Sequence, residues 1–88
     1  MLILKSTRSF EKDLKKTKKR SKDLTKIAKI IDQLIQEKPL PQKNHEHKLV
    51  GEYVGFWECH IEPDWLLIYE KTNTEIILTR TGTHSDLF

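Results

Sequence analysis

The sequence predicts one α+β domain, residues 1–88, in which two N-terminal helices pack on a twisted antiparallel β-sheet. A chain of 88 residues has room for a single hydrophobic core. Its first half carries apolar residues at helical spacing. Its second half, from His45 onward, carries short aromatic and β-branched runs separated by turn residues. Helices followed by a series of strands are typical of this class.

The N-terminal residues predict a short strand and then a lysine-rich helix. Leu2–Lys5 is the strand candidate, and Ser6 or Ser9 is expected to cap the helix because a side-chain oxygen can accept a first-turn N–H. Phe10 and Leu14 lie four residues apart and form the inner face of this helix. Few other apolar residues follow them, so the helix must be stabilised by packing against the rest of the domain.

The next segment has the clearest helical periodicity in the chain. Ser21 is its expected cap, and the segment from Lys18 to Ser21 is a polar turn between the two helices. Pro39 and Pro41 end the helical region, because proline cannot continue a helix. The apolar stripe of this second helix consists of Leu24, Ile27, Ala28, Ile31, Leu34 and Ile35.

Three further runs predict an antiparallel meander, which the N-terminal strand is expected to join. Tyr53–Ile61 is rich in aromatic and β-branched residues, with Gly55 as a candidate bulge. Trp65–Tyr69 is a buried run, and Thr72 with Asn73 forms a tight turn before the last strand opens at residues 76–78.

The charge is unevenly distributed along the chain. Residues 5–29 hold eleven Lys or Arg and three acids, a local charge of +8, whereas the net charge of the whole chain is +3. A basic half of this density favours a polyanion or an acidic protein as partner, although a solvated helical face would look similar. Cys59 is the only cysteine, and the apolar run at residues 1–4 is too short for a signal sequence or membrane span, so we expect a cytoplasmic protein without disulfides.

Side chains suited to acid–base chemistry gather in the C-terminal half. The four histidines are His45, His47, His60 and His84. Their spacing does not favour a metal site, because Cys59 would point away from His60 on the same strand. Proton transfer fits better, since the ordinary pKa of histidine, about 6.5, is close to neutrality.

Asp64 and Arg80 add a carboxylate at a strand end and a guanidinium suited to phosphate. A base, an acid and a cation around a phosphate are what RNA cleavage through the ribose 2′-OH requires, without a cofactor. Each residue alone would be unremarkable on a protein surface, and a non-catalytic basic binding module for an acidic protein or nucleic acid is the alternative interpretation.

Two C-terminal segments carry a family resemblance. HIEPDWLLIYE, residues 60–70, and LTRTGTHSDLF, residues 78–88, closely resemble the YafQ branch of the RelE-like toxins from bacterial type II toxin–antitoxin modules. HKLVGEY, residues 47–53, also fits, and the resemblance extends over essentially the whole chain. It implies a microbial-ribonuclease-like α+β fold, cleavage of mRNA on the ribosome, and neutralisation by a cognate antitoxin.

The resemblance also implies roles for individual residues. His84 would be the general acid, Asp64 or His60 the base, and His47 an assisting group, with Arg80 stabilising the phosphate. Trp65 also matches the family pattern but could equally belong to the core, and His45 has no counterpart in that pattern. The residues expected to contact RNA are Phe88, which would stack on a base, and the basic residues Lys15, Lys16, Lys18, Lys19 and Arg20.

Overall fold

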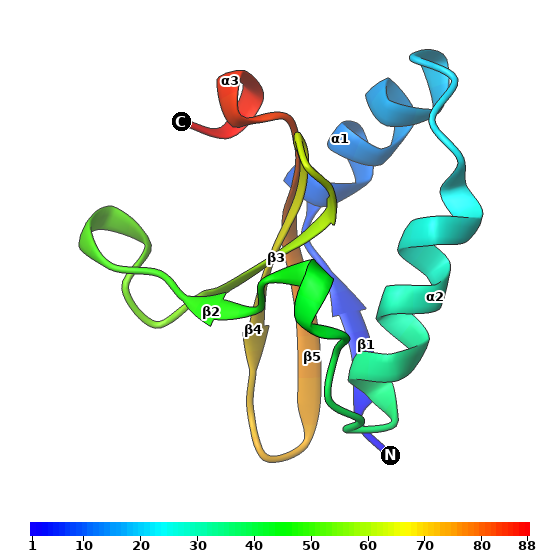
Figure 1. Ribbon diagram of the computed structural model, residues 1–88. Coiled ribbons are helices and arrows are strands. Elements are labelled where there is room, and N and C mark those ends of the chain that lie inside the picture. Colours follow the sequence, from blue (N-terminus) through cyan, green and yellow to red (C-terminus); the bar gives the residue numbers. More distant parts are fainter.

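In the computed structural model, which describes residues 1–88, one strand precedes two long helices, and the other four strands follow them (Figure 1). The regular elements are β1 (Ile3–Ser6), α1 (Arg8–Lys19), α2 (Leu24–Ile35), β2 (His47–Lys48), β3 (Trp57–Glu62), β4 (Trp65–Lys71), β5 (Glu75–Gly82) and α3 (His84–Leu87). Two single 3₁₀ turns, η1 (Gln42–Asn44) and η2 (Gly51–Tyr53), flank β2. This order confirms the predicted α+β class.

The sheet has five strands in the order β1-β5-β4-β3-β2. Strands β2 to β5 form the predicted antiparallel meander. The N-terminal strand joins the sheet as expected, but it runs parallel to β5, with Ile3 opposite Glu75 and Ser6 opposite Leu78. The sheet is thus mostly antiparallel, with one parallel pair at this edge, because β1 and β5 are joined by a long crossover and not by a hairpin.

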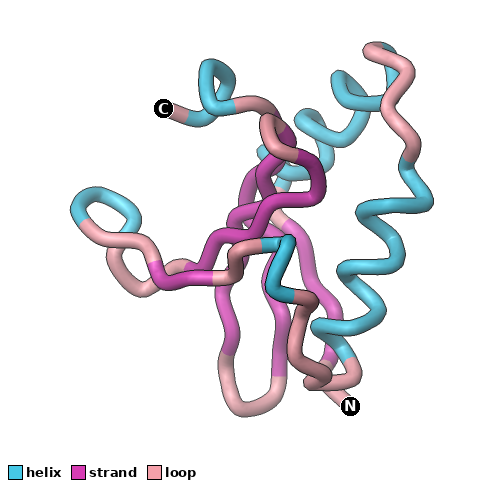
Figure 2. The backbone as a smooth tube through the Cα atoms, in the orientation of Figure 1, coloured by secondary structure: helices cyan, strands magenta, loops and turns pink.

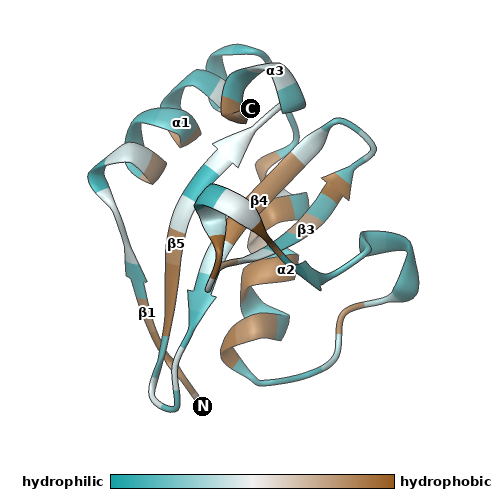
Figure 3. Ribbon diagram, turned by 90° about the vertical axis from the view of Figure 1, so that its left-hand side faces the viewer, coloured by the Kyte–Doolittle hydropathy of each residue, from teal (hydrophilic) through white to brown (hydrophobic).

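Both long helices cover the same face of the sheet (Figure 1). Phe10 from α1 and Ile27 and Leu34 from α2 are buried against Leu67 and Tyr69 of β4. Figure 3 shows apolar residues along β4, β5 and part of α2, whereas α1 is largely hydrophilic. The main core thus lies between this face and the helices, and α1 relies on it as expected. No helix has both the length and the apolar character needed to cross a bilayer.

The opposite face of the sheet is covered only in part. Leu66 and Ile68 of β4 pack there against Leu87 of α3, with the partly buried Tyr53 and Phe56 at the edge. Figure 2 shows η2 and α3 on the side of the strands away from the two long helices, whereas η1 lies near α2. The rest of this face is open, and we call it the open face.

The caps of the helices differ from those predicted. Thr7, not Ser6 or Ser9, caps α1, and its Oγ1 accepts the N–H of Phe10 at 3.0 Å because Ser6 is still paired in β1. Asp23, not Ser21, caps α2 by accepting the N–H of Thr25 at 3.0 Å.

The predicted turn between the helices was also placed too early. Lys18 and Lys19 are the last residues of α1, and Ser21, with a φ of 62°, belongs to the turn that ends this helix. The polar composition of residues 18–21 therefore does not distinguish the exposed last turn of the helix from the loop that follows it.

The third strand is shorter than predicted. It begins at Trp57, because Tyr53 lies in η2 and Gly55, with a φ of 94°, belongs to the loop that precedes the strand. The irregularities in the ladder lie instead between His60 and Glu62 and between Ile68 and Tyr69. The first of them re-aims the end of β3, where the candidate site begins.

Candidate active site

Three strand residues of the site, two of them predicted, share the open face. His60 lies opposite Leu66, and Glu58 and Arg80 lie on either side of Ile68, on β3 and β5. Directly opposed residues project from the same side of a sheet, so all three share the face with Leu66 and Ile68. Cys59 points the other way into the core, as predicted, and burial raises the pKa of its thiol to about 12, which makes it an unreactive core residue.

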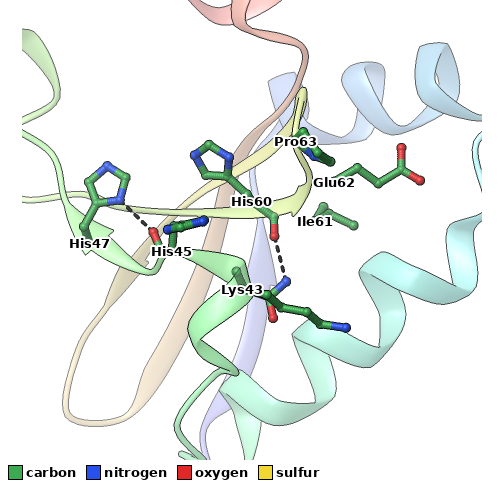
Figure 4. A pocket seen from close by; sticks show the side chains of 8 residues that line it. Lys43, His45, His47, His60, Ile61, Glu62 and Pro63 are labelled. Atoms are coloured by element: carbon green, nitrogen blue, oxygen red, sulfur yellow. Dashed lines mark hydrogen bonds between the residues drawn. The ribbon is translucent and has the colours of Figure 1, made fainter.

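The four histidines lie together, with His60 at the centre. The ring centroid of His60 is 5.5 Å from that of His45, 5.8 Å from that of His84 and 6.5 Å from that of His47. Figure 4 shows three of these rings around a pocket of about 670 Å³. The candidates His47, His60 and His84 thus lie close together, and His45, which has no family counterpart, lies in the same cluster.

A buried carboxylate that the sequence interpretation missed lies beside this cluster. Glu58 is 5% exposed, and its Oε1 lies 3.4 Å from Nε2 of His47 and 3.6 Å from Nε2 of His60. It precedes His60 by two residues on the same strand, and strand alternation alone puts both on one face. That spacing was the signal available in the sequence.

Asp64 holds His84 by two contacts. Its Oδ1 accepts the backbone N–H of His84 at 2.9 Å and lies 2.6 Å from Nδ1 of the ring. The backbone N–H and then the imidazole lower the pKa of the Asp64 carboxyl below its ordinary value. The ring is thus oriented through Nδ1, and Nε2 is left without a hydrogen bond on an exposed side chain.

The turn that carries His84 is fixed by a second carboxylate, Asp86, which was also missed. Thr83 caps α3 by accepting the N–H of Asp86 at 3.1 Å, and Asp86 accepts the N–H of Thr83 at 2.9 Å, a capping box. A Cβ at Gly82 would lie 2.9 Å from the Asp86 side chain, so glycine is required for this close approach.

Asp86 also ties this turn to the basic helix α1. Arg20 donates to it from two nitrogens, at 2.6 and 3.2 Å, and Lys16 donates at 3.3 Å. Both basic residues were expected to contact RNA, and the structure shows that part of their charge is used within the protein. Lys15, Lys18 and Lys19 are exposed and form no ion pair, so they remain free to meet a polyanion.

Replacing Asp86 with asparagine is expected to change how stability depends on pH. Arg20 and then the Thr83 N–H hold the pKa of Asp86 well below its ordinary value. A lowered folded-state pKa stabilises the protein at neutral pH, and this contribution is lost as the pH falls below the unfolded value of about 4. The stability gap between wild type and Asp86→Asn should therefore narrow between pH 5 and pH 2 in urea titrations.

The matched control for this prediction is Glu52→Gln, because Glu52 is exposed and forms no ion pair. Its stability should follow the wild type at every pH. A constant gap between wild type and Asp86→Asn over the whole range would contradict the assigned role of the carboxylate.

Arg80 lies at the other side of the open face and is held by Asp13 of α1. Its Nε donates to Oδ2 of Asp13 at 2.6 Å and one terminal nitrogen donates to Oδ1 at 3.2 Å. The same carboxylate accepts the N–H of Thr81 at 3.2 Å, and its hydrogen bonds raise the pKa of Arg80. Arg80 lies two strands from Glu58, about 10 Å across the sheet, and His60 lies two residues further along β3. Asp13 leaves the other terminal nitrogen of Arg80 free.

The two remaining aromatic candidates have different surroundings. Phe88 is 63% exposed and its ring meets that of Tyr53 edge-on, with centroids 5.5 Å apart. Its exposed ring is accessible from solvent, and stacking on a base stays a prediction. Trp65 is 1% exposed and its Nε1–H donates to Oγ1 of Thr81 at 3.0 Å, which makes it a core residue.

No group of three or more His, Cys, Asp or Glu side chains is arranged to hold a metal ion. The site consists instead of imidazoles beside a guanidinium, with Glu58 next to His47 and His60 and with Asp64 bonded to His84.

Comparison with known proteins identifies the family. The family model described as the bacterial toxin YafQ of type II toxin–antitoxin systems matches residues 2–88. The chain belongs to the YafQ toxin family. The curated mRNA interferase toxin YafQ of Escherichia coli K12 is 41% identical over 80 residues, which are 90% of this chain and 87% of the relative.

Solved structures agree with this assignment. The YafQ chain of the E. coli DinJ–YafQ toxin–antitoxin complex superposes with a TM-score of 0.92 and 38% identity, covering 99% of this chain and 97% of that one. A metal-bound toxin from Helicobacter pylori superposes with a TM-score of 0.94 and 39% identity, and both chains are covered completely. The YafQ-like fold expected from the two C-terminal motifs is therefore confirmed.

Proposed function

We propose that this member of the YafQ family is an mRNA-cleaving endoribonuclease that acts by acid–base attack of the ribose 2′-OH. The observation that carries the proposal is the histidine cluster. The rings of His45, His47 and His84 surround His60, and the ring of His84 is held by Asp64. The curated relatives named mRNA interferases support the substrate class.

In this proposal His60 is the general base. Asp64 is already engaged by the ring and backbone of His84, which leaves it a positioning role. His60 stands at the centre of the pocket with Glu58 beside it, and it takes the proton of the 2′-OH. The 2′ oxygen then attacks phosphorus, with His47 assisting on the far side of His60.

His84 is the general acid of the same reaction. As the P–O5′ bond breaks, its exposed Nε2 protonates the departing 5′ oxygen, which gives a 2′,3′-cyclic phosphate and a 5′-hydroxyl. Arg80 offsets the charge that develops on the phosphoryl oxygens, since Asp13 holds the guanidinium but leaves one terminal nitrogen free. The chemistry is supplied by side chains of this chain, so we propose that it needs no metal ion.

We propose two macromolecular partners besides the mRNA. The first is the ribosome, whose RNA phosphates would meet the exposed lysines of α1. The second is a cognate antitoxin, supported by the DinJ–YafQ complexes among the solved relatives. An amphipathic segment of such an antitoxin, backed by acidic residues, suits the basic surface of this chain.

The test is to incubate the purified protein with mRNA, with and without translating ribosomes, and to map new 5′ ends. We expect cuts whose 5′ ends carry a hydroxyl, at the same rate for protein that has been treated with EDTA and dialysed before it is added to the assay. Loss of cleavage after this treatment, and its recovery when a transition-metal ion is returned to the protein, would overturn the metal-independent route. If neither condition produces cuts, the protein is a binding module and not a nuclease.

A further inference from the structure

A second groove continues from the histidine pocket toward α2. It has a volume of about 270 Å³, lies between α2 and η1, and shares Lys43, Asn44 and Ile61 with the pocket that contains His60. Figure 4 shows Lys43 extending toward α2, away from the histidine rings. The two cavities thus form one continuous path across the end of β3.

The charge of this groove is positive. Its lining includes Lys26, Lys29 and Lys43 and no carboxylate. Lys26 is paired with Glu62 at 2.7 Å, whereas Lys29 and Lys43 form no ion pair. Two unpaired ammonium groups in a mostly polar groove suit an anion with an extended polar backbone better than an apolar segment.

The junction between the groove and the pocket is rigidly built. Asn44 is 5% exposed and its Nδ2 donates to the carbonyl of His60 at 2.7 Å, so the floor of the groove is tied to the strand that carries the proposed base. His45 follows with a φ of 47°, and its carbonyl accepts a hydrogen bond from Nδ1 of His47 at 2.7 Å. The backbone turn that carries His45 therefore fixes the positions of the neighbouring site residues.

We propose that this groove binds the single-stranded RNA next to the cut, with Lys29 and Lys43 on the phosphates and His45 at the entrance to the pocket. The inference rests on the proposed ribonuclease function, because RNA that reacts at His60 must leave the pocket in some direction. This exit is continuous with the pocket and carries the opposite charge to the phosphodiester backbone. The proposed groove is distinct from the α1 surface, on which the sequence predicts the RNA-binding lysines.

The test is the double variant Lys29→Glu with Lys43→Glu, in whichever cleavage assay the wild type supports. We expect KM to rise about tenfold while kcat changes less than about twofold, because both residues lie outside the acid–base machinery. The slope of log(kcat/KM) against log[salt] should also become shallower by about one to two, since up to two phosphate contacts are lost.

A matched control carries the same change of net charge elsewhere. Arg8→Glu with Lys38→Glu alters two exposed residues that form no ion pair and belong neither to the α1 lysines nor to the groove, and it should leave KM within about twofold of the wild type. Circular dichroism and urea titration would establish that both double variants are folded.

Photo-crosslinking identifies the occupant directly. An mRNA with 4-thiouridine next to the cut and a 2′-O-methyl group at the cut nucleotide should crosslink to residues 26–33 or 41–45 of the wild type, and less to the Lys29/Lys43 variant. An unchanged KM for the Lys29/Lys43 variant would overturn the inference. Weaker binding of the antitoxin together with normal cleavage would also overturn it, because the groove would then bind a protein. Absence of cleavage by the wild type would instead overturn the proposed function.

Discussion

Replacement of His84 by glutamine is expected to lower the cleavage rate by a factor of about 10²–10⁴, the usual contribution of a general acid or base. The side chain is exposed, and its ring contacts only Asp64 and the edge of His60, so the fold should not depend on it. The rate loss should fall on kcat, because the proton transfer occurs only in the transition state. Single-turnover cleavage and growth inhibition in bacteria are the measurements.

Two comparisons make this prediction specific. Asp64→Asn keeps the imidazole but removes the carboxylate that orients it, so we expect a smaller loss of rate and a changed pH–rate profile. Ser85→Ala, one residue further along α3, should cleave like the wild type. A His84→Gln variant that retains more than about a tenth of the wild-type rate would remove His84 from the mechanism.

Replacement of Trp65 by alanine is expected to destabilise the fold by about 3–5 kcal/mol. Its ring is 1% exposed in the main core, and its Nε1–H bonds the hydroxyl of the equally buried Thr81. A domain of this size has a total stability of only about 5–15 kcal/mol, so a large fraction of the variant should be unfolded in moderate urea. The free energy of unfolding from urea titration is the measurement.

The control for this prediction is Trp57→Ala on the neighbouring strand. Trp57 is only partly buried and its ring faces the ammonium of Lys71, 4.1 Å from the centroid, so its loss should cost less. Trp65→Phe should cleave at the wild-type rate per folded molecule. A lower kcat in a fully folded Trp65→Phe protein would show that the indole acts in the reaction as well as in the core.

The parts of the fold that could be predicted from sequence depend on local periodicity. The apolar stripe of α2, the aromatic and β-branched run of β3 and the buried run of β4 arise from residues close in sequence, and the structure confirms all three elements. The caps and the parallel edge strand depend on competition with distant segments. From the local sequence alone, Ser6 is as suitable a helix cap as Thr7. Its pairing with Leu78 in the sheet excludes it from that role, and no local pattern indicates this pairing.

The same distinction applies to the candidate site. His47, His60 and His84 could be selected by residue type and resemblance, and the structure brings them together. Asp13 and Asp86 are ordinary surface acids in the sequence, and their basic partners lie 67 and 66 residues away. Supporting residues of this kind become visible only when the tertiary structure is known, since their partner defines their role.

The parallel pairing of β1 with β5 has a consequence for synthesis of the protein. Residues 3–6 have no partner strand until residues 75–78 have left the ribosome, and Arg80 and His84 follow immediately after. Such distant pairing delays closure of the sheet, because the intervening chain must first be ordered. The nascent chain therefore has no complete candidate site until residues 75–84 have emerged.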